Sequence, residues 1–457
     1  MRRALSCLIA VSALAGCSLA PKYVQPAAPV PAQFPQGGAY PAPDAGVPGK
    51  PWRETFTDPR LQSLVEQALA SNQDVALALA NVAAARARHG QQRAQLFPGL
   101  DVAAGYDRSG GSGADSDRFS VQAQVPGYEI DLFGRLSSLS GAARERWLAS
   151  EEARRGVRLA VVSEVAQAWL AHAADASLLA VAKDTAASAS ESLRLNRLRL
   201  AGGVAPRTDV RQAEIVLRTA EADVADLTTA LAQDRNALRL LLGAEPAEAD
   251  LPQSIADADR AIGMVPAGLD STVLLRRPDV MEAERELRAA NAEIGAARAA
   301  LFPKITLTGL LGFASDALGG LFSGGAFAWS GGIDAGYSIF SGGAGRAGVR
   351  LSEAQRDAAL ASYRKAIQTA FRDVADALAR AGTIDAQLRA VEAGDAAAAD
   401  NLGLATMRYR GGVDSYLEEL TARQNRYTAA RTLVRTRLLR AANRVELYRA
   451  LGADPSL

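Results

Sequence analysis

The sequence predicts a mainly α-helical protein with a membrane β-barrel portion, in which one helix–strand–strand–helix–helix unit occurs twice in tandem. Landmarks recur at a nearly constant offset: two Leu-Phe-Pro triplets end at Pro98 and Pro303, and two Gly-Gly-Val turns begin at Gly202 and Gly411. Each copy also contains a long tract without proline, which favours one uninterrupted helix. We therefore assign repeat 1 to residues 58–244, repeat 2 to residues 271–457, and a proline-containing linker to residues 245–270.

Residues 1–16 are predicted to be a signal peptide, because two arginines precede a short apolar run that ends at Cys17. The run Leu14-Ala15-Gly16-Cys17 resembles the lipobox of bacterial lipoprotein precursors, in which cleavage leaves the cysteine as a lipid-modified first residue. A chance cysteine after a signal sequence is the alternative. The only other cysteine, Cys7, lies in the segment that would be removed, so we expect no disulfide and no cysteine metal site in the mature chain.

Residues 17–57 are rich in proline, which predicts a lipidated, extended N-terminal tether that does not pack as a folded element. Helices are expected to follow, from Asp58 to about Leu96 in repeat 1 and from Pro278 to about Leu301 in repeat 2. Proline in each Leu-Phe-Pro triplet cannot continue a helix, so the chain is expected to become extended there.

Each repeat is predicted to contain two membrane-type strands after its triplet. Residues of about 100–108 and 118–126 in repeat 1, and of about 304–313 and 328–338 in repeat 2, alternate between apolar and polar side chains. One face is apolar, with aromatic residues near its ends, as in transmembrane barrel strands. The alternative is a soluble sheet with one wet face.

Four strands cannot close a barrel in a bilayer, where every unpaired backbone group at an open edge costs several kcal/mol. The smallest common membrane barrels have ~8 strands, so several chains must share one barrel. Three chains would give twelve strands, and two would give eight with little lumen. Beyond the signal peptide, we expect no stretch with the ~20 apolar residues that a membrane-spanning helix needs.

Two long helical hairpins are predicted to follow the strands. The proline-free tracts run from Leu136 to about Leu200 and from Ala347 to about Met407. Return helices run from Asp209 to Leu242 and from Tyr416 to Leu451. At 1.5 Å per residue, a tract of ~60 residues spans ~90 Å. Helices of that length need lateral partners, since helix propensity alone does not stabilise them.

Composition and motifs argue against several classes of function. The 51 basic and 50 acidic residues nearly balance, which argues against a nucleic-acid binder. The only histidines, His89 and His172, lack a metal-ligand spacing, and no catalytic constellation is present, so we expect neither a metal site nor an enzyme. Residues 343–348 match the dinucleotide pattern GxGxxG without a surrounding βαβ unit, so no cofactor is expected apart from the covalent lipid on Cys17.

Three segments resemble the outer membrane factor family, the TolC/OprM-type exit ducts of Gram-negative bacteria. They read LRRPDVMEAERELRAANAEIGAARAALFPKITLTG at residues 275–309, YEIDLFGR at residues 128–135, and RYRGGVDSYLEEL at residues 408–420. The lipobox is similar to that of the lipoprotein branch used with resistance-nodulation-division pumps. The resemblance implies a homotrimer in the cell outer membrane, with a twelve-stranded β-barrel above a long periplasmic α-helical barrel.

The implied function is passive conduction of small molecules such as drugs and toxic compounds from the periplasm to the exterior. A periplasmic adaptor (membrane fusion) protein would join the duct to an inner-membrane resistance-nodulation-division pump. Two alternatives stay open: a type I secretion exit duct for polypeptides, and a lipid-anchored trimeric coiled-coil scaffold without a pore. The sequence does not name the substrates, the adaptor or the pump.

The family resemblance also implies that the hairpin tips close the periplasmic end of the duct. The matching positions make Arg408, Tyr409, Asp414 and Leu417 candidates for this gate, with Asp209 on the facing turn. The sequence departs from the family pattern at Thr421 and Ala201, where acidic residues are more usual. Our hypothesis is that Arg408 and Tyr409 hold the tips together until the adaptor or pump breaks their links.

Overall fold

The computed structural model describes residues 18–41, 50–111, 115–264, 270–452 and 454–457. The predicted signal peptide and the lipidation site at Cys17 lie outside the described residues. The chain divides into two compact units: unit 1 comprises Met1–Ala28, Ala80–Glu152 and Met281–Lys365, and unit 2 comprises Pro29–Leu79, Ala153–Val280 and Ala366–Leu457. Each unit therefore draws on both sequence repeats.

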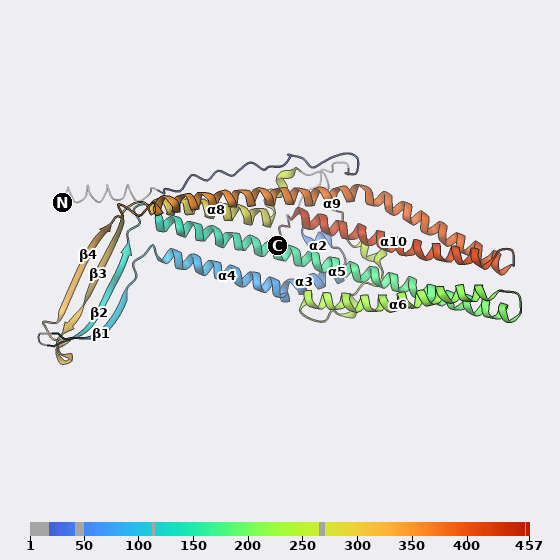
Figure 1. The fold of residues 1–457 in the computed structure, drawn as a ribbon, viewed down its shortest axis with the longest axis horizontal. Helices are drawn as coiled ribbons and strands as arrows, with labels where there is room; N and C mark the ends of the chain where they lie inside the picture. The colour runs from blue at the N-terminus through green and yellow to red at the C-terminus, as the bar shows by residue number, and fades with distance from the viewer. Residues whose placement is uncertain (1–17, 42–49, 112–114, 265–269, 453) are drawn as a thin grey trace. The chain divides into compact units, whose positions relative to one another are not determined.

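Long helices dominate the described residues (Figure 1), and the two repeats have matching lengths. The longest helices, α5 and α9, each contain 67 residues, and their return helices, α6 and α10, each contain 36. The helix bounds are α2 Trp52–Thr55, α3 Pro59–Ser71, α4 Gln73–Ala94, α5 Arg135–Ala201, α6 Arg207–Leu242, α7 Ile255–Arg260, α8 Pro278–Ala299, α9 Ala344–Arg410 and α10 Tyr416–Leu451. Short 3₁₀ turns occupy Glu248–Asp250, Ser271–Arg276 and Leu318–Gly320.

Local sequence signals set the helix ends. The Asp58 side chain accepts a hydrogen bond from the Arg60 backbone N–H at 2.8 Å, while Pro59 supplies a preset first residue for α3. Asn72 caps α4 in the same way, through the backbone N–H of Asp74 at 2.8 Å. The return helices α6 and α10 both end at a glycine in the left-handed region, with φ of +67° at Gly243 and +61° at Gly452.

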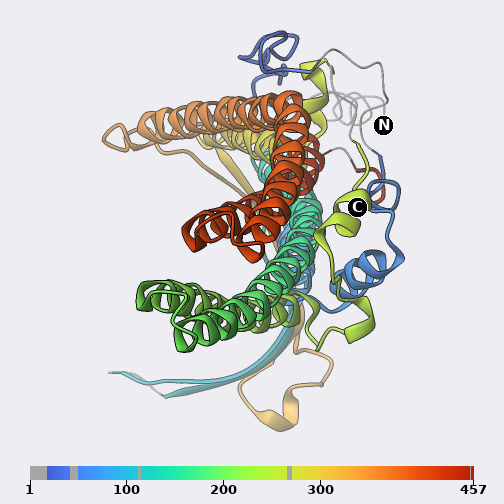
Figure 2. The ribbon, with the colours of Figure 1, turned by 90° about the vertical axis from the view of Figure 1, so that its right-hand side faces the viewer.

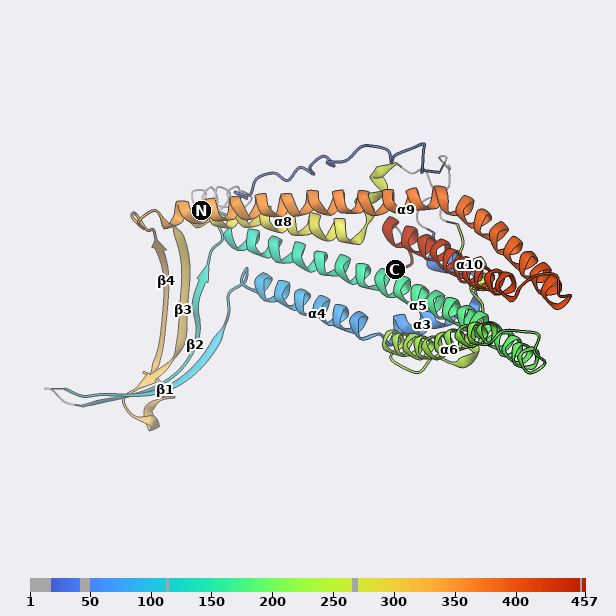
Figure 3. The ribbon, with the colours of Figure 1, turned by 45° about the vertical axis from the view of Figure 1, so that its right-hand side comes forward.

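Unit 1 contains a four-stranded antiparallel sheet in the order β1-β2-β3-β4 (Figure 3). The strands are β1 Asp101–Ser109, β2 Ser116–Glu129, β3 Lys304–Ser315 and β4 Phe327–Gly336. The predicted end of the second strand at residue 126 was too early, because pairing with β3 resumes at Tyr128 after a register shift around Pro126. The predicted end of the fourth strand at residue 338 was too late, because its partner β3 begins at Lys304, opposite Gly336.

One face of this sheet presents exposed apolar side chains. Register pairs on that face include Leu307 with Ile333 and Leu311 with Trp329, and all four side chains are exposed. The opposite face pairs Thr306 with Asp334 and Gln122 with Ala103. An apolar face without cover is typical of strands that contact lipid.

The core of unit 2 is larger than the sequence predicted, because two segments expected to be connectors contribute to it. Trp52 and Phe56 lie at the end of the predicted tether, yet both are buried in the main hydrophobic cluster. Leu251, Ile255 and Ile262 of the predicted linker are buried in the same cluster. The expectation that the tether does not pack was wrong there, since Trp52 and Phe56 belong to the same buried cluster as Trp169 of α5.

Helix α5 contains an 18-residue window that is long and apolar enough to cross a membrane by length and composition. This corrects the expectation that no such stretch follows the signal peptide. Ten residues of α5 are members of the buried core cluster: Leu159, Val161, Val162, Val165, Ala166, Trp169, Leu170, Ala173, Ala174 and Leu178. The apolar character of α5 is therefore explained by burial inside unit 2.

The described part of the tether is extended, as predicted, but it also packs. In unit 1, the Tyr23 hydroxyl donates to the Glu284 carboxylate at 3.1 Å, and the Arg288 guanidinium lies over the Tyr23 ring. In unit 2, Phe34 is buried and stacks on Phe371 at a ring distance of 5.0 Å. The tether is therefore fixed along its path by specific side-chain contacts.

Gly382 of α9 provides the closest approach of the tether, and its replacement by alanine is expected to displace residues 39–41. A Cβ atom at Gly382 would overlap the Ala39 carbonyl oxygen and lie 2.8 Å from the Pro41 nitrogen. Limited proteolysis should then cleave the tether faster than in the wild-type protein. Gly394→Ala is the matched control, because a Cβ atom at Gly394 of the same helix meets nothing within 4 Å. Equal cleavage of both variants would contradict this contact.

Candidate functional site at the hairpin turns

Two helical hairpins end in turns (Figure 2, α5–α6 in green and α9–α10 in orange and red), and the backbone hydrogen bonds of the two turns are nearly identical. In the first turn, the Gly202 N–H donates to the Leu198 carbonyl and the Val204 N–H donates to the Arg199 carbonyl, both at 2.9 Å. The second turn repeats these bonds from Gly411 and Val413 at the same distances. The middle glycines have φ of +75° and +74°, a conformation that strongly favours glycine. The duplicated turns therefore place the flanking side chains in equivalent positions.

Tyr409, at the end of α9, links the second hairpin to the first. Its hydroxyl donates to the Asn196 side-chain oxygen of α5 at 2.8 Å, and both residues are buried. The Arg199 guanidinium lies over the Tyr409 ring, 4.6 Å from its centre, and the ring centres of Tyr409 and Tyr416 are 5.5 Å apart. Burial raises the pKa of Tyr409 above its usual value, so its hydroxyl keeps the proton that it donates. This is a desolvated contact between hairpins.

A buried ion pair lies beside Tyr409. Glu419 and Arg423 sit one turn apart on α10, 2.7 Å apart, with only 3% and 8% of their surfaces exposed. Arg423 also donates to two hydroxyls of α5, Ser188 at 2.5 Å and Ser192 at 3.0 Å. The Arg423 guanidinium therefore joins α10 to α5 while Glu419 balances its charge.

Arg408 and Asp414 form a different kind of pair. Two hydrogen bonds of 2.5 and 2.8 Å join the Arg408 guanidinium to the Asp414 carboxylate across the turn between α9 and α10. The Arg408 guanidinium holds the pKa of Asp414 below its usual value. Because both residues belong to one hairpin, this pair shapes the turn and does not itself reach the other hairpin.

The remaining predicted residues lie around this cluster. Asp209 lies in the first turn of α6. The N-cap residue of this helix is Pro206, and no side chain caps the helix by a hydrogen bond. Leu417 is 56% exposed at the start of α10, and the Thr421 hydroxyl donates to the Leu417 carbonyl at 2.8 Å. Ala201 is the last residue of α5 and is exposed. The gate roles of Asp209 and Leu417 stay predictions.

Sequence reasoning missed Asn196, Glu419 and Arg423. Asn196 and Arg423 bond to partners on the other hairpin that lie more than two hundred positions away, as for Tyr409 and Asn196 at 213 positions, and Glu419 pairs with Arg423 on its own helix. The available signal was the order Ala422-Arg423-Gln424, where the family pattern has Gln before Arg. The swap moves the arginine onto the buried face of α10, where Arg423 meets the serines of α5.

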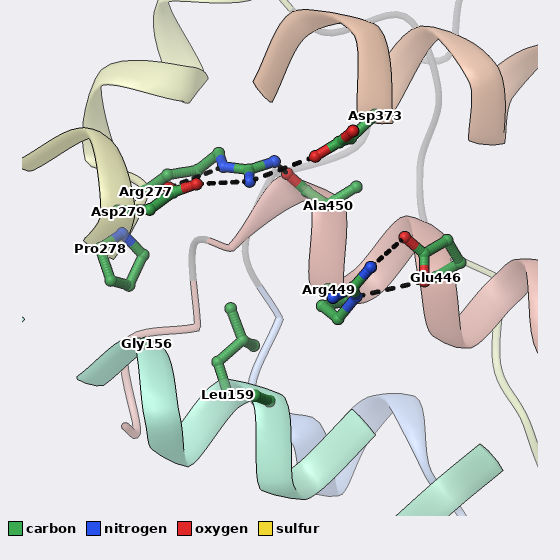
Figure 4. Close-up of a pocket in the computed structure, with 10 residues that line it drawn as sticks. Gly156, Leu159, Arg277, Pro278, Asp279, Asp373, Glu446, Arg449 and Ala450 are labelled. Carbon is green, nitrogen blue, oxygen red and sulfur yellow. Dashed lines mark hydrogen bonds and ion pairs between the residues drawn. The ribbon is translucent and has the colours of Figure 1, made fainter. Parts of the chain in front are cut away.

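A second polar cluster surrounds Arg277, in a small cavity of about 150 Å³ within unit 2 (Figure 4). Arg277 donates to the Asp279 carboxylate at 2.8 and 3.0 Å and to the Ala450 carbonyl near the end of α10. Asp373 of α9 lies 3.7 Å from the same guanidinium. Arg277 therefore joins the start of α8, the middle of α9 and the end of α10. Among the described residues, no group of three or more His, Cys, Asp or Glu side chains could hold a metal ion.

Comparisons with known proteins agree on one family. The family model described as outer membrane efflux protein matches residues 64–244 and 269–453, one range in each sequence repeat. The solvent efflux pump outer membrane protein SrpC of Pseudomonas putida is 42% identical, with 98% of each chain covered. Outer membrane protein OprJ of Pseudomonas aeruginosa is 38% identical, with 98% of this chain and 95% of OprJ covered.

The fold is also similar to solved structures. The open state of the Neisseria gonorrhoeae outer membrane channel MtrE superposes with a TM-score of 0.87 at 33% identity, covering 96% of this chain and 99% of that one. The fold of this chain is therefore similar to that of a solved outer membrane channel. This chain belongs to the outer membrane efflux protein family.

Proposed function

We propose that this protein is the outer-membrane exit duct of a tripartite efflux pump and conducts small molecules passively from the periplasm to the exterior. The observation that carries this proposal is the four-stranded sheet of unit 1. It presents an exposed apolar face, and β1 and β4 form its two edges. Lipid tolerates an exposed apolar face but not an open edge, so the sheet requires further strands from other chains.

A homotrimer supplies those strands, since three copies of four strands make a closed barrel of twelve. A covalent lipid on Cys17 would anchor each copy by its tether. The relative SrpC is named as the outer membrane protein of a solvent efflux pump, and OprJ is named as an outer membrane protein. The name of SrpC supports other pump components as partners, which we propose to be a periplasmic adaptor and an inner-membrane resistance-nodulation-division pump. We infer no catalytic role and no cofactor apart from the lipid.

The gate is proposed to lie at the hairpin turns, where Tyr409 joins α9 to α5. Tyr409→Phe is expected to increase the open probability of the duct in planar bilayers. The variant leaves the buried Asn196 oxygen without its donor, which costs ~1–3 kcal/mol, or roughly five- to a hundredfold in an equilibrium. Tyr23→Phe removes a hydroxyl from unit 1 and serves as the matched control. If Tyr409→Phe and Tyr23→Phe have the same open probability, the Tyr409 hydroxyl has no role in the gate.

Two assays separate this function from its alternatives. Expression with a matching adaptor and pump in an efflux-deficient strain is expected to restore resistance to small toxic molecules. Restoration of polypeptide secretion without such resistance would favour a type I secretion duct instead. A closed barrel is also expected to keep the oligomer intact in unheated gel samples, whereas a coiled-coil scaffold without a pore would show no heat-dependent mobility.

A further inference from the structure

Two aspartates face each other across the first hairpin, far from the turns. Asp175 lies on α5 and Asp234 on α6, and their carboxyl groups are within hydrogen-bonding reach of each other. One oxygen of Asp234, Oδ2, is covered from solvent and has no hydrogen-bond partner among the described residues. Two carboxylates have only acceptors, so they cannot bond to each other unless one of them carries a proton.

The surrounding charges do not neutralise the pair. His172, one turn before Asp175, is buried, and its Nδ1 lies 3.2 Å from the Pro252 carbonyl oxygen. Burial lowers the pKa of His172, which favours its neutral form. Arg235, next to Asp234 on α6, forms an ion pair with Glu248 of the 3₁₀ turn that packs nearby. The cation closest to Asp234 in sequence, Arg235, therefore has Glu248 as its ion-pair partner.

The duplication supplies an internal comparison. The offset that relates Gly202 to Gly411 is 209 positions, and it relates Asp175 to Ile384 and Asp234 to Asn443. Ile384 is buried, and the Asn443 side chain donates to the Ala377 carbonyl of α9 at 3.2 Å. The second hairpin thus has an apolar residue and a satisfied amide at the positions where the first has two acids.

We propose that Asp175 and Asp234 form a proton-binding site that joins α5 to α6 while it holds one proton and loosens the first hairpin when both carboxylates ionise. The ligand of this site is the proton itself, and the atom that would bind it is the covered Oδ2 of Asp234. The second hairpin has Ile384 and Asn443 at the matching positions, so this proton-binding site acts on the first hairpin alone.

The direction of the pH effect follows from the pKa values. Burial, followed by the neighbouring Asp175 charge, raises the pKa of Asp234 from 3.8 to about 6, and burial also raises the pKa of Asp175. Because the pKa of Asp234 is higher in the folded state than in the unfolded state, the pair contributes its full stabilisation of the hairpin at pH values below the unfolded pKa. This stabilisation is lost as the pH rises through the folded-state pKa of about 6. The first hairpin is therefore more stable at pH 5 than at pH 7.5.

Hydrogen exchange of the full-length protein in detergent tests this site. Protection factors, corrected for intrinsic exchange, are compared at pH 5 and pH 7.5 for peptides around Asp234 and around Asn443. A raised pKa of this size, reduced by solvent screening, predicts a ~10-fold loss of protection around Asp234 at the higher pH. No such loss is expected around Asn443.

Asp234→Asn supplies a permanent donor and is expected to abolish the pH-dependent loss. Asp226→Asn, at an exposed position on the same helix, is the matched control and should keep it. The proposal is overturned if the wild-type loss is the same in both hairpins, or if Asp234→Asn retains it. If Asp234→Asn does not fold, the comparison of the two hairpins in the wild-type protein and in Asp175→Asn decides the question.

Discussion

Replacing Glu419 with glutamine is expected to increase the open probability of the duct by ~10-fold or more, because it leaves the Arg423 guanidinium buried without a counter-charge. Breaking a buried pair by removing one partner typically costs ~3–5 kcal/mol. Here the pair also attaches α10 to Ser188 and Ser192 of α5, so its loss weakens the contact between hairpins. Single-channel recording in planar bilayers measures the change.

Asp414→Asn is the matched control for this prediction. It also removes one carboxylate from an arginine–carboxylate pair, but the Arg408–Asp414 pair is exposed and lies within one hairpin. Exposed ion pairs contribute little, so Asp414→Asn should change the open probability much less than Glu419→Gln. Equal effects of the two variants would show that burial of the pair is irrelevant to opening.

Replacing Arg277 with alanine is expected to destabilise the end of α10 by ~1–3 kcal/mol, roughly five- to a hundredfold in the local opening equilibrium, because the Ala450 carbonyl loses its donor. The change removes the donor to the Ala450 carbonyl and the longer contact with Asp373 at 3.7 Å, while Asp373 keeps its ion pair with Arg372 (Figure 4). Hydrogen exchange of peptides at the end of α10 measures local opening without requiring a two-state unfolding of the whole chain.

Arg276→Ala provides the control for Arg277, because it removes the same side chain from the neighbouring exposed position. Its exchange at the end of α10 should stay close to that of the wild-type protein. A similar acceleration in both variants would mean that Arg277 acts only through general charge and not through its contacts with Asp279 and Ala450.

Most helices and the existence of the four strands could be predicted, because proline, glycine, capping residues and the alternation of side chains act locally. Pro59, Gly243 and Gly452 set helix ends that depend on their own backbone conformation. Strand ends were less predictable, because they depend on the partner: β4 ends at Gly336 only because β3 begins opposite it. Burial of Trp52 and Ile255 was missed for a related reason, since their apolar partners lie on distant helices.

The candidate site was only partly predictable. Arg408, Tyr409 and Asp414 could be named as candidates because they match the positions of the hairpin tips in the family that the sequence resembles. Glu419 and Arg423 could not, since an acid and a base at helical spacing usually form an exposed pair. Only the three-dimensional packing against Ser188 and Ser192 distinguishes this pair from the exposed ones.

Single-channel recording of the purified wild-type oligomer in planar bilayers tests the central claim most directly. If three chains close one barrel around a lumen, the protein will insert with uniform current steps, and Glu419→Gln will increase the time spent in the conducting state. Incorporation of an intact, heat-modifiable oligomer that produces no current steps, in either the wild-type protein or Glu419→Gln, would contradict the assignment of a duct.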